Sequence, residues 1–128
     1  MPITRGSTFI LTRATGSVPH LWVVLSDPAG DPPEVVILSL TTLRPHSDET
    51  VVLNPGDHPF VQHPTCAYFS DARIVTVQSL ERALRLRQAI PQPDMDAAIV
   101  ERMRDGLFQS PFTIHAIRER CRVLFGRS

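Results

Sequence analysis

The sequence of 128 residues contains no lysine, two cysteines and no long apolar run. All thirteen basic residues are therefore arginine, whose planar guanidinium suits phosphate and carboxylate groups better than an ammonium does, although a biased genome composition gives the same result. The longest apolar runs, residues 21–25 and 35–38, are far shorter than the roughly 20 residues that cross a bilayer, which excludes a membrane-spanning helix. Cys66 and Cys121 form no Cys-x-x-Cys motif, and we expect both thiols to be free.

We expect neither a secretory signal nor secretion, because no apolar segment follows Arg5 near the N-terminus, and we expect a cytoplasmic protein. With 42% hydrophobic and 20% charged residues, the composition predicts one globular domain over residues 1–128. Residues 1–70 carry three arginines and six acidic residues, whereas residues 71–128 carry ten arginines and seven acidic residues. The basic second half favours a contact with RNA or an acidic partner, or it consists of solvated helix faces.

The first half of the chain is rich in short runs of β-branched and aromatic residues. Glycine, proline, aspartate or asparagine clusters such as "DPAGDPP" and "NPGD" separate these runs, as they do in sheets with tight turns. The runs are residues 7–12, 20–26, 34–43, 49–54 and 72–77. No helix long enough for a crossover lies between them, so they predict a small antiparallel β-barrel of about five strands over residues 1–78, closed to protect its edges.

The second half predicts three helices, which makes the fold α+β with a helical C-terminal part over residues 79–128. The first helix begins at Ser79 as a cap and stops at Pro91, and the second starts at Asp94. The third is expected between Ser110, as its cap, and Gly126. Its apolar stripe, which includes Cys121, predicts a packed helix face rather than a cofactor site.

The order of these segments resembles the MazF/PemK-type toxin endoribonucleases. The segments "GSTFIL", "PHLWVVLS", "VVILSLTT", "ETVVL" and "ARIVTVQSLERAL" follow the plan of that family over residues 6–86. The resemblance implies an SH3-like barrel, cleavage of single-stranded RNA without a metal ion or other cofactor, a homodimer, and a cognate small antitoxin as protein partner.

The resemblance also suggests catalytic residues. Thr41, in "SLTT", falls on the threonine of the family's Pro-Ile-Thr-Ser segment, whereas His20 falls where the family has the arginine of Gly-His-Arg-Pro. A histidine has an ordinary pKa near 6.5 and can serve as base or acid close to neutral pH. His20 could therefore transfer the proton when a ribose 2′-hydroxyl attacks the adjacent phosphate. Thr41 would donate a hydrogen bond to the phosphate, and Arg44 or Arg73 would supply positive charge.

The loop "LNPGDHPFVQHPTC", residues 53–66, carries two further histidines. His58 and His63 each precede a proline, which restricts the backbone to extended conformations and orients the ring. We predict that both histidines face a substrate beside His20, unless the loop is only a rigid turn. Tyr68 follows as a candidate platform on which an RNA base stacks, while one residue of the Tyr68–Phe69 pair belongs to the core.

Two other functions remain open at this stage. A non-catalytic SH3-like module could bind RNA or protein without cleaving it. Alternatively, His58, His63 and Asp57 could bind a metal ion in a hydrolase, and the spacing of His63 and Cys66 also occurs in zinc sites. Structural zinc sites need four ligands, and no second pair with matching spacing is present, so we expect no metal.

Overall fold

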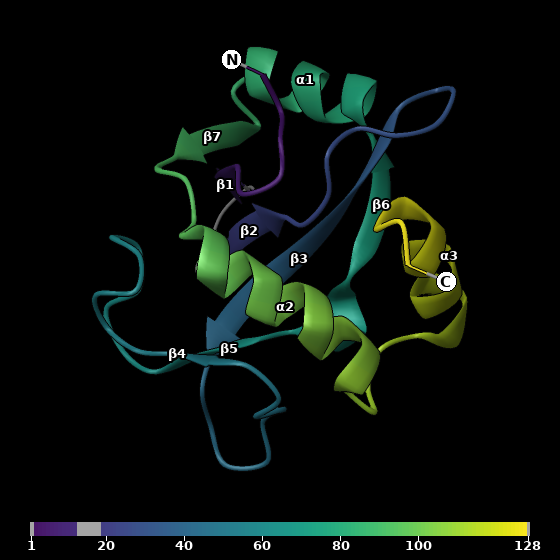
Figure 1. The fold of residues 1–128 in the computed structure, drawn as a ribbon. Coiled ribbons are helices and arrows are strands. Elements are labelled where there is room, and N and C mark those ends of the chain that lie inside the picture. The colour runs from purple at the N-terminus through teal and green to yellow at the C-terminus, as the bar shows by residue number, and fades with distance from the viewer. Residues whose placement is uncertain (1, 13–18, 128) are drawn as a thin grey trace.

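A seven-stranded antiparallel sheet and three α-helices make up the molecule, which a computed structural model describes for residues 2–12 and 19–127 (Figure 1). The fold is therefore α+β, as predicted. The strands are β1 Thr8–Leu11, β2 Leu21–Val24, β3 Glu34–Thr42, β4 Val52–Leu53, β5 Thr65–Ala67, β6 Arg73–Thr76 and β7 Ala89–Gln92. The helices are α1 Val77–Arg85, α2 Ala97–Gln109 and α3 His115–Leu124, and a short 3₁₀ turn spans Phe69–Asp71.

The nine-residue strand β3 is the centre of the sheet because three other strands pair with it. On one edge it pairs with β2, with Trp22 opposite Ser39. On the other edge its first half pairs with β6 and its last three residues pair with β5. The main path of the sheet runs β4-β5-β3-β2-β1-β7. The end of β3 therefore lies beside β4 and β5 (Figure 1).

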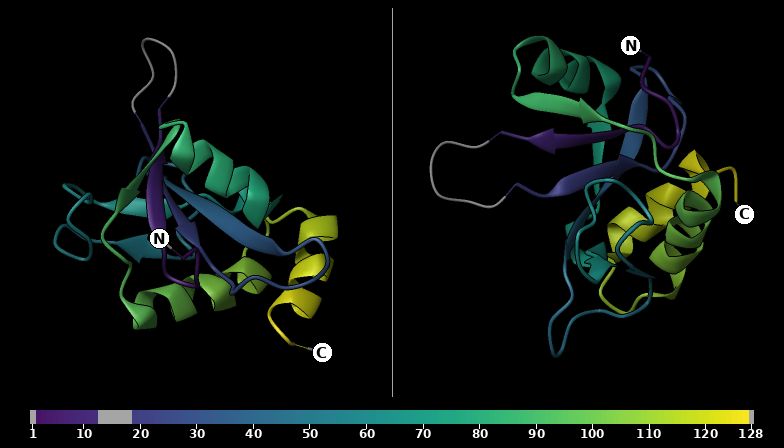
Figure 2. Two further views of the ribbon diagram at one scale, coloured as in Figure 1. Left: turned by 90° about the horizontal axis from the view of Figure 1, so that it is seen from above. Right: turned by 90° about the vertical axis from the view of Figure 1, so that its left-hand side faces the viewer.

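Both faces of the sheet are buried. Leu21 and Val23 of β2 enter a larger core, whereas Trp22 and Val24 enter a smaller core with Leu80 of α1. The α2 side chains in the larger core are Val100, Met103 and Leu107. Figure 2 shows α1 on one side of the sheet and α2 and α3 on the other. Strands buried on both faces carry apolar residues at every position, which explains the continuous runs at residues 21–25 and 35–38.

The prediction of a closed barrel with about five strands is wrong. Among the described residues the sheet has seven strands, and its ends β4 and β7 do not pair with each other. The two unpredicted strands are β5 and β7. Helix α1 contacts both β6 and β7. Because the helix covers these strands, their edges are protected without a further strand pairing that would close a barrel.

Helix α1 begins and ends earlier than predicted. Thr76, and not Ser79, is its N-cap, because the Thr76 side chain accepts a hydrogen bond from the Ser79 amide. The helix ends at Arg85, and Arg87 takes a positive φ of 59° that turns the chain back. Pro91 does not stop the helix but lies in β7, opposite Phe9. A proline fits there because β7 is an edge strand, where one amide needs no partner.

The second and third helices begin at other residues than predicted. Asp96, rather than Asp94, caps α2 through hydrogen bonds from the amides of Ala98 and Ile99. Ser110 does not begin α3 but ends α2, where its amide bonds to the carbonyl of Gly106. Helix α3 starts only at His115.

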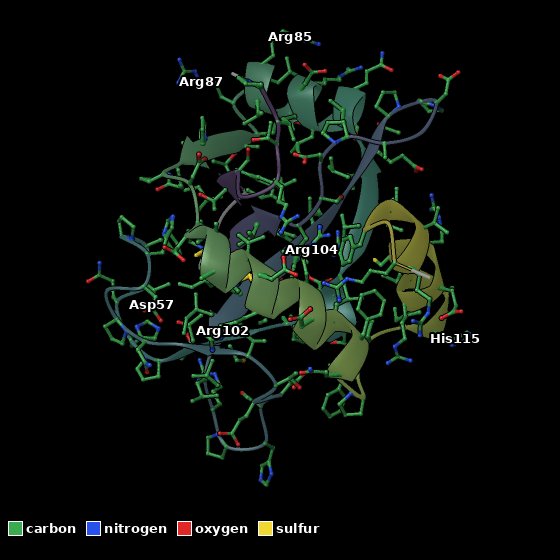
Figure 3. All side chains as sticks on the ribbon, viewed as in Figure 1. Asp57, Arg85, Arg87, Arg102, Arg104 and His115 are labelled. Atoms are coloured by element: carbon green, nitrogen blue, oxygen red, sulfur yellow. The ribbon has the colours of Figure 1, made fainter. Side chains whose placement is uncertain are left out.

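Arg104 of α2 is a buried charged side chain that binds the backbone of two other segments of the fold (Figure 3). Its guanidinium donates hydrogen bonds to the carbonyls of Leu25, after β2, and Phe125, after α3. It also lies 4.1 Å from the centre of the Phe125 ring and pairs with Glu101. These contacts offset the cost of removing the charge from water.

Both thiols are free and buried, in agreement with the prediction, and Cys121 is fully enclosed in the larger core. Burial raises the pKa of the Cys121 thiol to about 11, so the neutral thiol packs there as a small apolar group. Within the ranges that the structure describes, we find no helix with the length and apolar character needed to cross a membrane.

Replacing Gly106 by alanine tests how tightly α2 packs on the sheet. The new methyl group would lie 2.7 Å from Cγ2 of Val51 and 2.8 Å from Cζ of Phe69, and both neighbours are buried. In a free helix the change stabilises by about 0.5–1 kcal/mol, but overpacking a dense core costs about 1–3 kcal/mol. We expect the Gly106→Ala variant to be less stable than wild type in urea unfolding.

Gln109→Ala, at an exposed position of the same helix, should change the free energy of unfolding by less than about 0.5 kcal/mol. A Gly106→Ala variant more stable than wild type would contradict the close packing described for α2.

Candidate active site

A cavity of about 570 Å³ lies where β2 begins and β3 ends. The loop between β4 and β5 forms another wall through residues 59–63. Four of the predicted site residues, His20, Thr41, Arg44 and His63, line this one cavity. Further polar side chains on its wall are Thr42, Gln62, Thr65 and Gln92. The fold thus brings together residues that are separated by more than 40 positions in the sequence.

The pairing of β2 with β3 positions the first two of these residues. Trp22 lies opposite Ser39, and extending this register by two residues places His20 opposite Thr41. The His20 ring is fixed by a hydrogen bond of 3.1 Å between its Nδ1 and the carbonyl oxygen of Leu40. Because a carbonyl only accepts, Nδ1 carries the proton, and the neutral ring keeps its lone pair on Nε2.

The pairing of β5 with β3 brings His63 to the same place. Thr42 lies opposite Thr65, and the Thr65 hydroxyl donates to the carbonyl of His63 at 2.8 Å. The Thr42 hydroxyl lies 3.0 Å from Nε2 of His63. Thr42 is thus a candidate site residue that the sequence analysis missed. Its place next to Thr41 was no signal for it, because neighbouring residues of a strand face opposite sides of a sheet. The cavity includes both threonines because it lies where β3 ends.

His58 does not share this cavity but is a buried structural histidine. Its side chain is 2% exposed, and its Nε2 lies 2.6 Å from the carbonyl oxygen of Pro93, to which it donates. Its Nδ1 accepts a hydrogen bond of 3.0 Å from the amide of Phe60. Both ring nitrogens are therefore used within the protein. His58 fastens the β4–β5 loop to the segment that precedes α2, which holds the cavity wall in place.

The turn "NPGD" is closed by its own residues. Asp57 accepts a hydrogen bond from the amide of Asn54, and the Asp57 amide donates back to the carbonyl of Asn54. Gly56 takes a φ of +97°, a conformation that glycine adopts without strain. Figure 3 shows Asp57 on this outer loop.

The ligand set of the metal-dependent alternative does not form. His58 is buried against Pro93, whereas His63 lines the cavity and Asp57 closes its own turn. In the two ranges that the structure covers, no three histidine, cysteine, aspartate or glutamate side chains lie close enough together to hold a metal ion.

The remaining predicted site residues lie outside this cavity. Tyr68 is 47% exposed and lines a second cavity of about 180 Å³, which shares Thr41 with the first. Its neighbour Phe69 is the core residue of the pair, at 1% exposure. Arg73 pairs with Asp71 and lies 5.1 Å from the centre of the Trp22 ring, away from both cavities. Arg44 is thus the predicted arginine that reaches the cavity.

Many arginines of the basic second half form hydrogen bonds or ion pairs with other residues of the protein. They bind backbone carbonyls or pair with carboxylates, as seen for Arg73, Arg102, Arg104, Arg118, Arg120, Arg122 and Arg127. In Figure 3, Arg85 and Arg87 lie near α1, whereas Arg102 lies on α2 beside β4. The labelled arginines of this half thus lie on more than one element of the fold.

Comparisons of the chain with protein-family models, with curated proteins and with solved structures found no match. The resemblance to the MazF/PemK-type toxins therefore depends on the sequence segments quoted above, and the site has to be interpreted from its own geometry.

Replacing each histidine of the loop by alanine separates their roles. His58→Ala removes a buried ring and leaves the partly buried amide of Phe60 without its partner, which costs about 1–3 kcal/mol. His63→Ala removes an exposed side chain and should change stability by less than about 0.5 kcal/mol. The free energies of unfolding in urea at constant pH measure both effects. Equal losses in the two variants would contradict the division of roles.

Proposed function

We propose that the larger cavity is the active site of a ribonuclease that cleaves single-stranded RNA without a metal ion. The observation that carries the proposal is that His20, His63 and Arg44, from three separate segments of the chain, line one cavity. Two imidazoles can supply the base and the acid that RNA cleavage needs near neutral pH. A cavity of about 570 Å³ also lies within the usual range for ligand sites, about 300–1,000 Å³.

His20 is the proposed general base. With Nδ1 donating to Leu40, its Nε2 lone pair takes the proton of a ribose 2′-hydroxyl. The 2′-oxygen then forms a bond to the adjacent phosphorus, and the bond from phosphorus to the 5′-oxygen of the next nucleotide breaks. The products are a 2′,3′-cyclic phosphate and a free 5′-hydroxyl. DNA lacks the attacking hydroxyl and is not a substrate.

His63 is the proposed general acid. In its protonated form both ring nitrogens carry hydrogen, and the Thr42 hydroxyl can accept from Nε2 at 3.0 Å. Nδ1 then carries the proton that the leaving 5′-oxygen receives. Thr42 and the bond from Thr65 to the His63 carbonyl fix the ring and its backbone, so both act as positioning residues.

Arg44 and Thr41 are proposed to stabilise the phosphate during the reaction. Charge accumulates on the non-bridging oxygens when the 2′-oxygen attacks, and a guanidinium stabilises that charge through charge-assisted hydrogen bonds. The Thr41 hydroxyl adds a neutral donor next to the base His20. In this arrangement His20 stands where the MazF/PemK-type family has an arginine, and Arg44 supplies the positive charge instead.

The biological role that we propose follows from the resemblance. A ribonuclease of this kind would act on cytoplasmic RNA as the toxin of a toxin–antitoxin pair, as a homodimer held inactive by a small antitoxin. The central strand β3, paired with β2, β5 and β6, is compatible with an SH3-like arrangement. A non-catalytic RNA- or protein-binding module on the same fold is the alternative that an inactive protein would indicate.

Cleavage of a long single-stranded RNA in the presence of chelator tests the proposal. Wild type should cut the RNA and leave 2′,3′-cyclic phosphate ends. His20→Ala should lose about 10²–10⁴-fold in rate, because the general base is gone. The matched control is His115→Ala, which removes an exposed histidine on α3, far from the cavity in the fold, and should cut at the wild-type rate (Figure 3).

Intact RNA with wild type, together with unslowed growth of cells that express it, would contradict the ribonuclease. Equal activity of wild type and His20→Ala would instead reject His20 as the base.

A further inference from the structure

The second cavity lies directly beside the proposed active site. Its volume is about 180 Å³, and Thr41 lines both cavities. Its walls come from the end of β3, from β5 with the residues that follow it up to Ser70, and from two loops, one at residues 46–48 and the other following α2. An RNA chain whose phosphate contacts Thr41 in the larger cavity can therefore place a neighbouring base in the smaller cavity.

Two exposed aromatic rings line the smaller cavity. Tyr68 is 47% exposed and Phe112 is 56% exposed, although large aromatic side chains are normally buried. They come from segments far apart in the sequence, one after β5 and the other between α2 and α3. Nucleic-acid bases stack on exposed aromatic rings of this kind, and each stacked base strengthens binding.

A carboxylate is one of the polar groups of the same cavity, which His46, Ser47 and Ser70 also line. Asp48 accepts hydrogen bonds from the Ser110 hydroxyl at 2.6 Å and from the hydroxyl and amide of Thr50. Burial raises the pKa of Asp48, but these hydrogen bonds outweigh it and hold the pKa below its usual value. The carboxylate is therefore ionised near neutral pH, accepts hydrogen bonds without donating any, and is held in one orientation.

We propose that the smaller cavity is a nucleobase subsite, which stacks the base on Tyr68 and Phe112 and favours bases with an exocyclic amino group. Cytosine donates from its N4 amino group, and adenine and guanine carry amino groups as well, whereas uracil presents a carbonyl oxygen at the position of the cytosine amino group. An ionised carboxylate attracts the amino group and repels the carbonyl. The subsite rests on the proposed function, because it binds the nucleotide next to the phosphate that the larger cavity cleaves.

Binding of uncleavable oligonucleotides tests the subsite apart from catalysis. Fluorescently labelled hexamers of 2′-O-methyl cytidine and of 2′-O-methyl uridine lack the attacking hydroxyl, and their dissociation constants are measured by anisotropy at one salt concentration. Wild type should bind the cytidine hexamer about 5- to 100-fold more tightly than the uridine hexamer. Phe112→Ala and Tyr68→Leu should each weaken binding of the cytidine hexamer by about 5- to 100-fold.

Val123→Ala is the control, because it shortens another exposed apolar side chain outside both cavities and should bind like wild type. Phe112 is exposed, so its replacement leaves the core intact. Equal binding of the two hexamers by wild type, no binding of either, or unchanged binding by the Phe112 and Tyr68 variants would each overturn the subsite.

The two proposals fail in different ways. If wild type and Phe112→Ala bind the cytidine hexamer alike but both cleave RNA at the same positions, the ribonuclease stands and the subsite is overturned. If RNA stays intact while binding of the cytidine hexamer depends on Phe112, the subsite stands and the ribonuclease is overturned.

Discussion

The register between β2 and β3 is the constraint on which both the core and the site depend. With Trp22 opposite Ser39, alternate residues of the two strands enter two separate cores, and His20 comes to lie opposite Thr41. A slip by one residue would exchange the faces of a whole strand and move Trp22 into the core that α2 fills. The packing that fixes the register thereby also fixes the distance between His20 and the end of β3.

The loop between β4 and β5 places one of its histidines in the interior and the other at the cavity. His58 uses both ring nitrogens within the protein and anchors the loop against Pro93, whereas His63 is exposed beside Thr42 at the cavity. A loop with a buried anchor can hold an exposed residue in one position without regular secondary structure. This rigidity is what a proton-transfer site requires, because its groups must stay within hydrogen-bonding distance of the substrate.

Local patterns predicted most strands, because apolar β-branched runs mark them, and the register of β2 with β3 places His20 opposite Thr41. They did not predict β7, since Pro91 argues against a strand unless its edge position is known. Barrel closure was wrong because α1 covers the strands that would otherwise need to pair, a tertiary contact that no local pattern reveals. His58 and His63 both precede proline, so only the fold shows which one is buried.

The central claim is that His20 and His63 act as base and acid in one cavity. The most direct measurement is the pH dependence of kcat/KM for RNA cleavage, in chelator, by wild type and by the two single alanine variants. We expect a bell-shaped profile for wild type, loss of the acidic limb in His20→Ala and loss of the alkaline limb in His63→Ala. If both variants keep both limbs, His20 and His63 are not the base and the acid.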